Sequence, residues 1–492
     1  MAIEQVATGE KQVEAMDDAP QNVIVASQKD LENIPEIDHV AEAKLVRKLD
    51  RFIVPPVMLL YLVSFLDRVN IGNARLYGLE KDLNLHGSQF QTAVSILFVT
   101  YVLLEVPCNL LIKKLRPSRF ISAITVGWGI VATLTGLVQG YAGLIVCRLL
   151  LGALEAGLFP GMTIYLTMFY TKRELALRVG YLFVSAAIAG SLGGLLAYGI
   201  GFMDGVAGES GWRWILIIEG IIVFWWLADS PETAYYLTPA EKDLMLVRKR
   251  RQIGHTTSGD LLHKEDVIKA FKDWKIWLFA AGQFGVDTLL YGYSTFLPTI
   301  IKGLGTWSTP QVQALTVPCY ALGAITYLTV AYFSDRYQQR FLAILPFAII
   351  SIIGYGILLA DVAPGVHFFG CFLVATGLYV SVGIPLAWLP SGLPRYGKRT
   401  TATGMQLTIG NCAGIMAPFL YKTNEGPRYT RGHAVSLAMV AMATIFYSIL
   451  WAYFIAENKR RNAGKRDGKI AGKTEEEIAE MGDENPRFMF TH

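Results

Sequence analysis

The sequence predicts an all-α integral membrane protein with about 12 transmembrane helices arranged as two six-helix bundles. Hydrophobic residues make up 53% of the 492 residues and charged residues 17%, and the mean hydropathy is +0.38, so the chain is more apolar than a soluble protein of this length. The apolar residues gather in twelve long runs. A charged segment separates the first six runs from the last six, as expected when a site lies between two half-bundles.

Each apolar run is a candidate membrane span. The runs cover approximately 52–72, 88–112, 120–138, 142–168, 177–202, 213–228, 275–300, 310–332, 341–360, 366–390, 402–421 and 433–456. Most reach the roughly 20 residues that a helix needs to cross the hydrocarbon core. Their length and their scattered Gly and Pro residues favour helices over barrel strands. The sixth run is short, because its apolar part, Trp214 to Ala228, spans roughly 22 Å of a core of about 30 Å and is interrupted by Glu219.

The segments around the runs give a domain division. We expect a disordered cytoplasmic tail at 1–51, a six-helix bundle at 52–228, a cytoplasmic central loop at 229–273, a second bundle at 274–456 and a cytoplasmic tail at 457–492. Residues 1–50 contain no early apolar stretch, so the first span must direct insertion. All five cysteines fall in apolar runs, which indicates buried thiols rather than a disulfide framework.

Basic residues predict the orientation in the membrane. They concentrate in alternate loops, at Lys44, Arg47, Lys48, Arg51, Lys113, Lys114, Arg116, Arg119, Lys172, Arg173, Arg178, Arg248–Arg251, Arg336, Arg340, Arg395, Lys398, Arg399 and Lys459–Arg461. The positive-inside rule therefore places both termini and the central loop in the cytoplasm. The 422–431 loop, which also carries basic residues, is an exception. We expect a multi-pass protein of the plasma membrane.

Two places within the spans carry charge. Arg148 and Glu155 lie two turns apart on one helix face, roughly 10 Å along the axis, and Gly152 on that face would let a neighbouring backbone approach closely. Asp67 and Arg68 lie near the end of the first span, at a depth similar to that of Arg148. Ionisable groups in a bilayer mark a pathway or a buried pair. We favour a functional site, because two arginines at one level can hold a carboxylate, over a static ion-pair network.

Asp287 is a third charged residue inside a span. Gln283 lies one turn earlier and Tyr291 one turn later on the same side of the predicted helix. The group could face a cavity or form a helix-packing hydrogen bond, and both interpretations stay open. Tyr379 and Trp388 could stack on an aromatic ligand, or serve packing and interface anchoring, as aromatic residues in spans usually do.

Catalytic and cofactor motifs are absent from the sequence. The serine and histidine residues form no nucleophile elbow and no metal-ligand pattern, and no loop of phosphate-binding type occurs. We therefore expect neither an enzyme nor an ATP-driven pump, no cofactor, no metal and no nucleic-acid partner. The expected partners are a small substrate, protons and the lipid bilayer, and the expected state is a monomer.

Seven segments carry a family resemblance. They are DRVNIGNA (67–74), EVPCNLLIKKLRPSR (105–119), RLLLGALEAGLFPG (148–161), AGSLGGLLAYGIG (189–201), GWRWILIIEG (211–220), DSPETAYYL (229–237) and GMQLTIGN (404–411). Together they resemble the major facilitator superfamily and, within it, the anion:cation symporters of the fungal allantoate and nicotinate permease-like group. The resemblance runs from about Lys44 to Glu457. It implies a carrier that takes up small organic anions with protons by alternating access.

The resemblance also implies roles for single residues. Asp67 and Glu155 would carry coupling protons. Arg68 and Arg148 would engage the substrate or these acids, and Asn411 would lie near the substrate; we add Gln283 and Trp388 to this substrate-binding set. The resemblance further implies that Asp335 and Arg336 belong to a gating loop, and that Glu105 belongs to a structural motif.

Two departures from the group concern substrate and stability. Gly392 stands where relatives usually carry Asn, four residues after Trp388, so no relative's substrate can be assumed. Relatives also have several more residues after the IIEG sequence of the sixth span. Either the bilayer thins around this span or a short segment is missing.

Three functions compete. We favour proton-coupled uptake of a carboxylate such as nicotinate, or of allantoate or a similar anion. The same fold permits export of an acidic secondary metabolite. A non-transporting nutrient receptor is disfavoured by the charges on both coupling helices, because a receptor needs no proton site.

Overall fold

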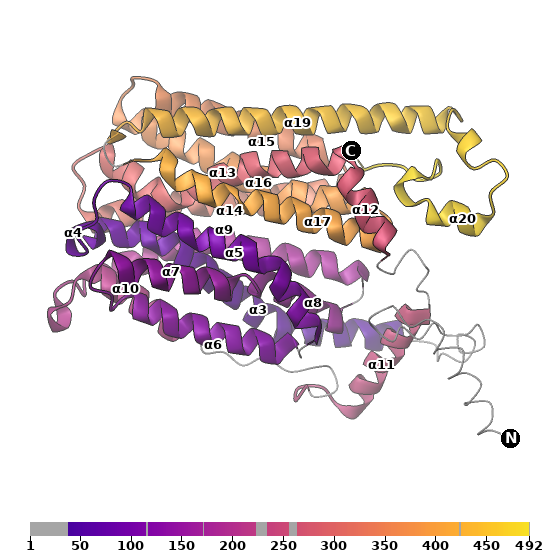
Figure 1. Cartoon of the computed structure of the whole chain (residues 1–492), viewed down its shortest axis with the longest axis horizontal. Coiled ribbons are helices and arrows are strands. Elements are labelled where there is room, and N and C mark those ends of the chain that lie inside the picture. Colours follow the sequence, from indigo (N-terminus) through magenta and orange to yellow (C-terminus); the bar gives the residue numbers. More distant parts are fainter. Residues whose placement is uncertain are drawn as a thin grey trace.

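The computed structural model describes residues 38–114, 117–170, 172–222, 234–254, 263–422 and 425–491, and these residues form helices and connecting turns without strands. Figure 1 shows two side-by-side groups of roughly parallel helices, one from each half of the chain. Six helices are long and apolar enough to cross a membrane by length and composition, and two shorter apolar helices accompany them. The predicted all-α fold is confirmed.

The first bundle follows the order of the predicted spans. Its helices are α3 (His39–Leu76), α5 (Gln89–Lys114), α6 (Pro117–Thr135), α7 (Tyr141–Glu155), α8 (Leu158–Phe169), α9 (Lys172–Gly201) and α10 (Gly211–Ile222), with the short α4 (Leu79–Asp82) and η2 (Val206–Gly208) in the connections. The fourth span is divided into α7 and α8 by a break directly after Glu155. The end of the sixth span, including Trp225 and Trp226, and the side chain of Glu219 lie outside the described residues.

The second bundle repeats the pattern. It contains α13 (Trp274–Gly303), α14 (Thr309–Tyr337), α15 (Arg340–Leu359), α16 (Pro364–Ser391), α17 (Tyr396–Asn411), α18 (Ala413–Met416), η4 (Ala417–Leu420) and α19 (Thr430–Asn462). The eleventh span is therefore broken too, and its break follows Asn411. The backbone stays in the right-handed helical region at Ala156, Gly157 and Cys412, so each interruption is a kink that comes directly after a residue singled out as a site candidate.

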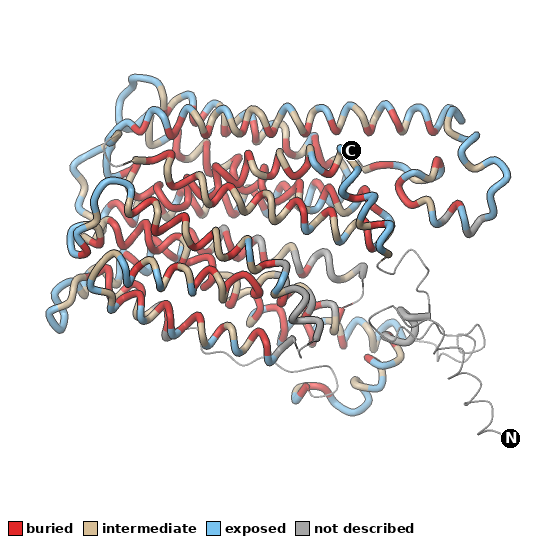
Figure 2. The backbone as a smooth tube through the Cα atoms, in the orientation of Figure 1, coloured by how far each residue is buried: buried red, intermediate tan, exposed pale blue. Residues whose placement is uncertain are grey.

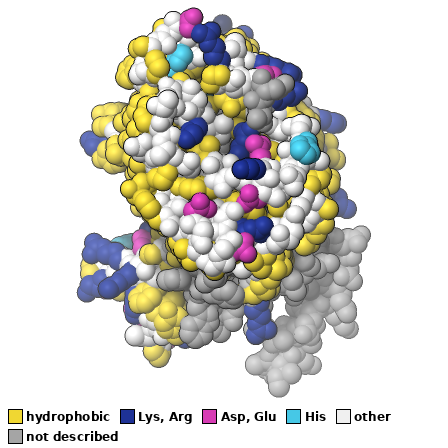
Figure 3. All heavy atoms as spheres, turned by 90° about the vertical axis from the view of Figure 1, so that its left-hand side faces the viewer, with side chains coloured by type: hydrophobic (Ala, Val, Ile, Leu, Met, Phe, Trp, Pro, Cys, Tyr) yellow, Lys and Arg dark blue, Asp and Glu magenta, His cyan; other side chains and the backbone are white. Residues whose placement is uncertain are grey.

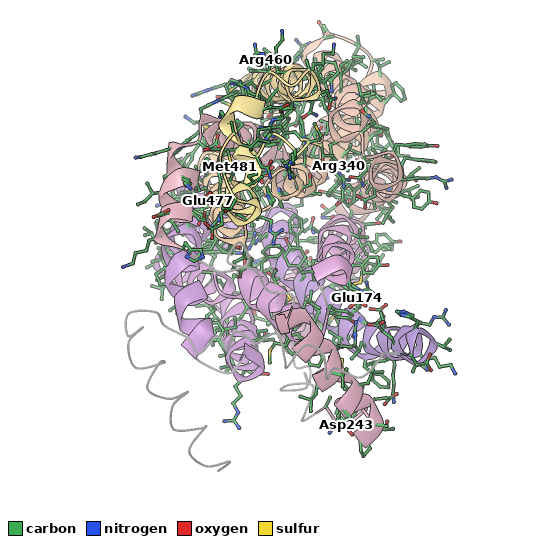
Figure 4. All side chains as sticks on the ribbon, turned by 90° about the vertical axis from the view of Figure 1, so that its right-hand side faces the viewer. Glu174, Asp243, Arg340, Arg460, Glu477 and Met481 are labelled. Carbon is green, nitrogen blue, oxygen red and sulfur yellow. The ribbon has the colours of Figure 1, made fainter. Side chains whose placement is uncertain are left out.

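One end of the molecule, where α3 begins and α19 ends, is called the basic end here. The central segment contributes α11 (Pro239–Gly254) and α12 (Lys264–Lys272) to this end. Arg248 of α11 is bound by Glu42 at 2.9 Å and by Glu174 at 2.7 Å, which fastens α11 to the first bundle. Arg395 binds Asp266 of α12 at 2.7 Å, which fastens α12 to the second bundle. Figure 4 looks onto this end and shows Glu174 on the first bundle and Asp243 farther out on α11.

The C-terminal segment, residues 463–491, folds back over the second bundle, with η6 (Asp467–Lys469), α20 (Glu475–Glu480) and η7 (Gly482–Glu484). Arg461 donates to the carbonyl oxygens of Asp483 at 2.9 Å and Asn485 at 3.0 Å. The ring of Phe490 stacks on that of Phe454 with centroids 4.7 Å apart. Figure 4 shows Glu477 and Met481 of this segment over the ends of the second-bundle helices. The segment predicted only as a tail is thus built into the bundle.

The two bundles contact each other at the end opposite the basic end. Gly72 of α3 lies against Thr295 of α13 so closely that a Cβ at Gly72 would be 2.0 Å from the Thr295 carbonyl oxygen. Gln91 donates to the Tyr421 carbonyl at 3.5 Å, and Arg75 lies over the ring of Phe296. Figure 3 looks onto this end and shows a continuous surface with scattered charged groups. Figure 2 shows buried residues concentrated along the helix faces between and within the bundles.

Candidate functional site

A central cavity lies between the two bundles and takes its walls from both. α3 contributes Arg68, α5 contributes Glu105, α13 contributes Gln283 and Asp287, and α17 contributes Asn411. Aromatic rings surround these polar groups, from Tyr61, Tyr101, Phe159, Tyr291, Tyr327 and Tyr379. A cavity lined by aromatic and aliphatic side chains with a few converging polar groups is the usual form of a small-molecule site.

The charged residues of the first and fourth spans form two crossed ion pairs. Arg68 binds Glu155, with its Nε and Nη2 both 2.8 Å from Oε2. Arg148 Nη1 donates to Asp67 Oδ2 at 3.2 Å. Asp67, Arg148 and Glu155 are almost completely buried, with exposed fractions of 0–1%. The charged residues of the first and fourth spans therefore lie next to one another, as predicted. Each ion pair joins an arginine of one span to an acidic residue of the other.

Small residues allow the helices to approach closely enough for these pairs. A Cβ at Gly152 would lie 2.1 Å from the Leu97 carbonyl oxygen, so α5 and α7 can touch only because this position has no side chain. Thr100 Oγ1 also donates to the Leu149 carbonyl at 3.0 Å. The close backbone approach predicted at Gly152 is confirmed.

The arginine that faces the cavity is Arg68. Its guanidinium carbon lies 4.7 Å from the centre of the Tyr101 ring and 5.6 Å from the centre of the Phe98 ring. The Arg68 side chain is 11% exposed. Arg148 is enclosed beside Asp67 and is not part of the cavity wall. The sequence-based picture of two arginines holding one carboxylate is therefore not what this conformation presents, because Arg148 is buried and already paired with Asp67.

The paired groups are incompletely hydrogen-bonded. Asp67 Oδ1, Glu155 Oε1 and the Nε and Nη2 of Arg148 are buried without a hydrogen-bond partner among the described residues. Buried polar atoms are costly when they lack partners, and a purely structural network would be expected to satisfy them. The free carboxylate oxygens can therefore accept a proton, and the free N–H groups of Arg148 can donate to another acceptor.

The second bundle supplies a hydrogen-bonded row along its cavity face. Gln406 Nε2 donates to Gln283 Oε1 at 3.2 Å, and Gln283 Nε2 donates to Asp287 Oδ1 at 2.9 Å. Tyr291 donates its hydroxyl proton to Asn411 Oδ1 at 2.6 Å. The predicted alignment of Gln283, Asp287 and Tyr291 on one side of α13 is borne out. Asp287 accepts a hydrogen bond from Gln283 of its own helix and also lines the cavity. The two interpretations, a hydrogen-bonded group and a cavity-facing group, are therefore compatible.

Glu105 is a site residue that the sequence reasoning assigned to a structural motif. Its side chain is buried, lines the cavity and accepts a hydrogen bond from Thr408 of the second bundle at 3.2 Å. It lies inside an apolar run, so the reasoning that selected Glu155 could have selected it as well.

Three of the remaining predicted residues, Trp388, Asp335 and Arg336, lie outside the cavity wall. Trp388 is buried among Phe279, Tyr447 and Phe454 and donates its Nε1 hydrogen to the Thr491 carbonyl at 2.9 Å, outside the cavity wall. Tyr379, the other aromatic candidate, does line the cavity. At the basic end, Asp335 pairs with Arg340, and Arg336 lies 3.4 Å from the Tyr332 hydroxyl. No group of three or more potential metal ligands occurs in the described part of the chain.

Comparisons with known proteins agree with this architecture. The family model of the Major Facilitator Superfamily matches residues 57–418. An uncharacterised transporter of Schizosaccharomyces pombe is 38% identical over 458 residues, covering 91% of this chain and 90% of that protein. The high-affinity nicotinic acid transporter of Saccharomyces cerevisiae is 32% identical over 483 residues, covering 96% and 89%. A crystal structure of a bacterial homologue of the human lysosomal transporter Spinster has a TM-score of 0.62 at 15% identity, covering 81% and 96%.

Proposed function

Because this chain belongs to the major facilitator superfamily and is a multi-pass membrane transporter, we propose that it carries a small organic anion together with protons across the plasma membrane. The relative from Saccharomyces cerevisiae transports nicotinic acid, which makes nicotinate the first substrate to test. Arg68, Gln283 and Asn411 are the proposed substrate-binding residues, and Asp67 and Glu155 are the proposed proton carriers.

The proposal rests on the position of Arg68 between Glu155 and the cavity, where its guanidinium can bind either Glu155 or a substrate. Its guanidinium reaches the cavity, while its partner Glu155 lies behind it with an exposed fraction of 1%. A substrate carboxylate that binds Arg68 competes with Glu155 for the same N–H groups. A buried carboxylate that loses its cation is strongly destabilised, so Glu155 then takes up a proton. Anion and proton therefore bind together, which is the condition for symport.

We propose that the basic end is cytoplasmic, since lysine and arginine concentrate in its loops. The contacts of Gly72 with Thr295 and of Gln91 with Tyr421 then lie at the outer end, where they hold the two bundles together. The resemblance to a gating loop suggests that Asp335 and Arg336 act at the cytoplasmic end during the reverse movement.

Transport in cells that express the protein tests the proposal. Labelled nicotinate should accumulate, should be displaced by other small carboxylates but not by their amides, and should be lost when a protonophore collapses the proton gradient. Substrate addition should make the medium more alkaline. Efflux of preloaded carboxylate without uptake would instead identify an exporter, and binding without movement of substrate or protons would identify a receptor.

A further inference from the structure

The two carboxylate oxygens of Asp287 differ in their contacts. Oδ1 accepts the hydrogen bond from Gln283, whereas Oδ2 has no hydrogen-bond or ion-pair partner among the residues that the structure describes. The side chain is 6% exposed and lines the central cavity. A carboxylate in the middle of a membrane span is costly unless a cation, a hydrogen-bond donor or a proton compensates it.

Neighbouring groups hold this carboxylate in place. Gln283 is itself held by Gln406, which fixes the amide so that its nitrogen donates to Asp287. On the other side α17 passes so close that a Cβ at Gly410 would lie 2.3 Å from Oδ2. The carboxylate is thus held in a fixed position from two sides while one of its oxygens has no partner, as expected of a ligand-binding group.

The charge balance of the cavity shows what this oxygen lacks. Among the described residues of the cavity wall, Arg68 is basic, and Glu105 and Asp287 are acidic. Glu155 already neutralises Arg68, and Glu105 accepts a hydrogen bond from Thr408. A ligand with negative charge at both ends would be repelled by Asp287. A ligand with an anionic end for Arg68 and a nitrogen for Asp287 would match both walls.

We propose that Asp287 Oδ2 binds a basic nitrogen at the end of the substrate opposite its carboxylate, and thereby selects nitrogen-containing carboxylates over plain ones. This inference rests on the proposed function. A single proton serves the contact in two equivalent ways, because either the nitrogen donates to the carboxylate or the carboxylic acid donates to the nitrogen. The rings of Tyr61, Tyr101, Tyr291 and Tyr379 in the wall favour a flat ring between the two ends.

Nicotinate and benzoate distinguish this role, because they share the ring and the carboxylate and differ in the ring nitrogen. Affinities of the purified full-length protein would be measured for both by competition against labelled nicotinate or by ligand-induced thermal shift. A hydrogen bond to a charged group contributes about 1.5–3 kcal/mol, so the native protein should prefer nicotinate roughly tenfold or more. In Asp287→Leu, which has a similar size but offers the ring nitrogen neither a donor nor an acceptor, the preference should fall to near unity, with benzoate binding retained.

Two further variants keep the test decisive. Glu105→Gln removes the other acidic charge of the wall and should leave the nicotinate-to-benzoate ratio unchanged, whatever it does to the rate. Gly410→Ala should displace Oδ2 without altering charge and should also lower the ratio, which covers the case that Asp287→Leu does not reach the membrane.

The outcomes separate the two proposals. Equal affinity of the native protein for nicotinate and benzoate, or an unchanged preference in both Asp287→Leu and Gly410→Ala, would overturn the role of Asp287 and leave carboxylate transport standing. Failure of the native protein to bind any small carboxylate would overturn the proposed function, and this inference with it.

Discussion

Arg68 and Glu155 form an ion pair in which both Nε and Nη2 of the arginine lie 2.8 Å from the same carboxylate oxygen. The other oxygen, Oε1, is buried without a hydrogen-bond partner among the described residues. The arginine therefore contacts half of the carboxylate and can move to a substrate carboxylate without breaking a fully formed bidentate pair.

Glu155→Gln should separate exchange from accumulation. The amide resembles the protonated acid but cannot release a proton, so uptake against a gradient should stop. Exchange of preloaded for external substrate should continue, because Arg68 is then permanently available. Counterflow and concentrative uptake of labelled nicotinate measure the two activities. Concentrative uptake at the native level would show that Glu155 is structural.

Arg68→Lys should abolish transport while the protein still reaches the membrane. Lysine keeps the charge, but it lacks the planar set of donors that binds a carboxylate through two parallel hydrogen bonds, and it stacks less well on Tyr101. Uptake would be compared at equal surface expression. Near-normal uptake by this variant would remove Arg68 from the substrate site.

Gly72→Ala should prevent closure of the end opposite the basic end. The added Cβ would lie 2.0 Å from the Thr295 carbonyl oxygen, so the bundles must separate there. We expect transport to be lost and the alternative conformation to gain population. A cysteine introduced at Phe90, whose ring packs on Phe296, should react faster with a membrane-impermeant maleimide.

Gly199→Ala is the matched control, because Gly199 also lies in a helix and a Cβ there meets nothing within 4 Å. Labelling of Phe90→Cys at the same rate with and without Gly72→Ala would contradict the proposed contact.

Asp483→Asn should destabilise the second bundle at neutral pH. Burial opposes ionisation of this carboxyl, but the nearby Lys275 and Lys398 outweigh it and lower the pKa of Asp483. Their Nζ atoms lie 3.0 and 2.9 Å from its oxygens. Asp273 stays beside both lysines, so we expect a loss of about 1–3 kcal/mol in the free energy of unfolding.

The pH dependence of this loss has a definite sign. A carboxyl with a lowered pKa contributes stability above its unfolded pKa of about 3.9 and loses it as the pH falls through the folded value. The difference in melting temperature between native protein and Asp483→Asn should therefore be full at pH 7 and shrink below about pH 4. Asp467→Asn, a change at an exposed aspartate of the same segment, should have no such effect. Equal melting temperatures of the native protein and Asp483→Asn at pH 7 would show that the ion pairs of Asp483 with Lys275 and Lys398 do not contribute to stability.

The sixth span provides a prediction about stability. The described helix α10 has 12 residues, and the remainder of the predicted span lies outside the described residues. A hydrophobic stretch about 8 Å shorter than the bilayer core carries a mismatch cost of fractions of a kcal/mol per Å. Insertion of a short apolar segment after Gly220 should raise surface expression and thermal stability. A decrease in both would show that the short span is native.

The sequence predicted the fold well because membrane spans are read from length and apolarity alone. It also placed Asp67, Arg68, Arg148 and Glu155 near one another, since depth in the membrane follows from helix geometry. It could not tell which acid pairs with which arginine, or that Arg148 is sealed from the cavity. Those facts depend on how each helix is rotated about its own axis within the bundle, which apolarity and length do not report.

Trp388 illustrates a different limit. Its partner, Thr491, lies 103 positions later in the chain, beyond the last predicted span. No periodicity within a single helix reports such a contact. Glu105 was missed for another reason, because a family motif suggested a structural role where burial in an apolar run already indicated a site.

The position of the last residues affects how this protein can be handled in the laboratory. Phe490 exchanges two backbone hydrogen bonds with the Asn458 side chain, and Thr491 is bound by Trp388. A fluorescent reporter or affinity tag fused directly behind Thr491 would start beside these contacts and would compete with the packing of the segment on the bundle. Purification and localisation studies should therefore separate a fusion partner from Thr491 by a long glycine-serine spacer.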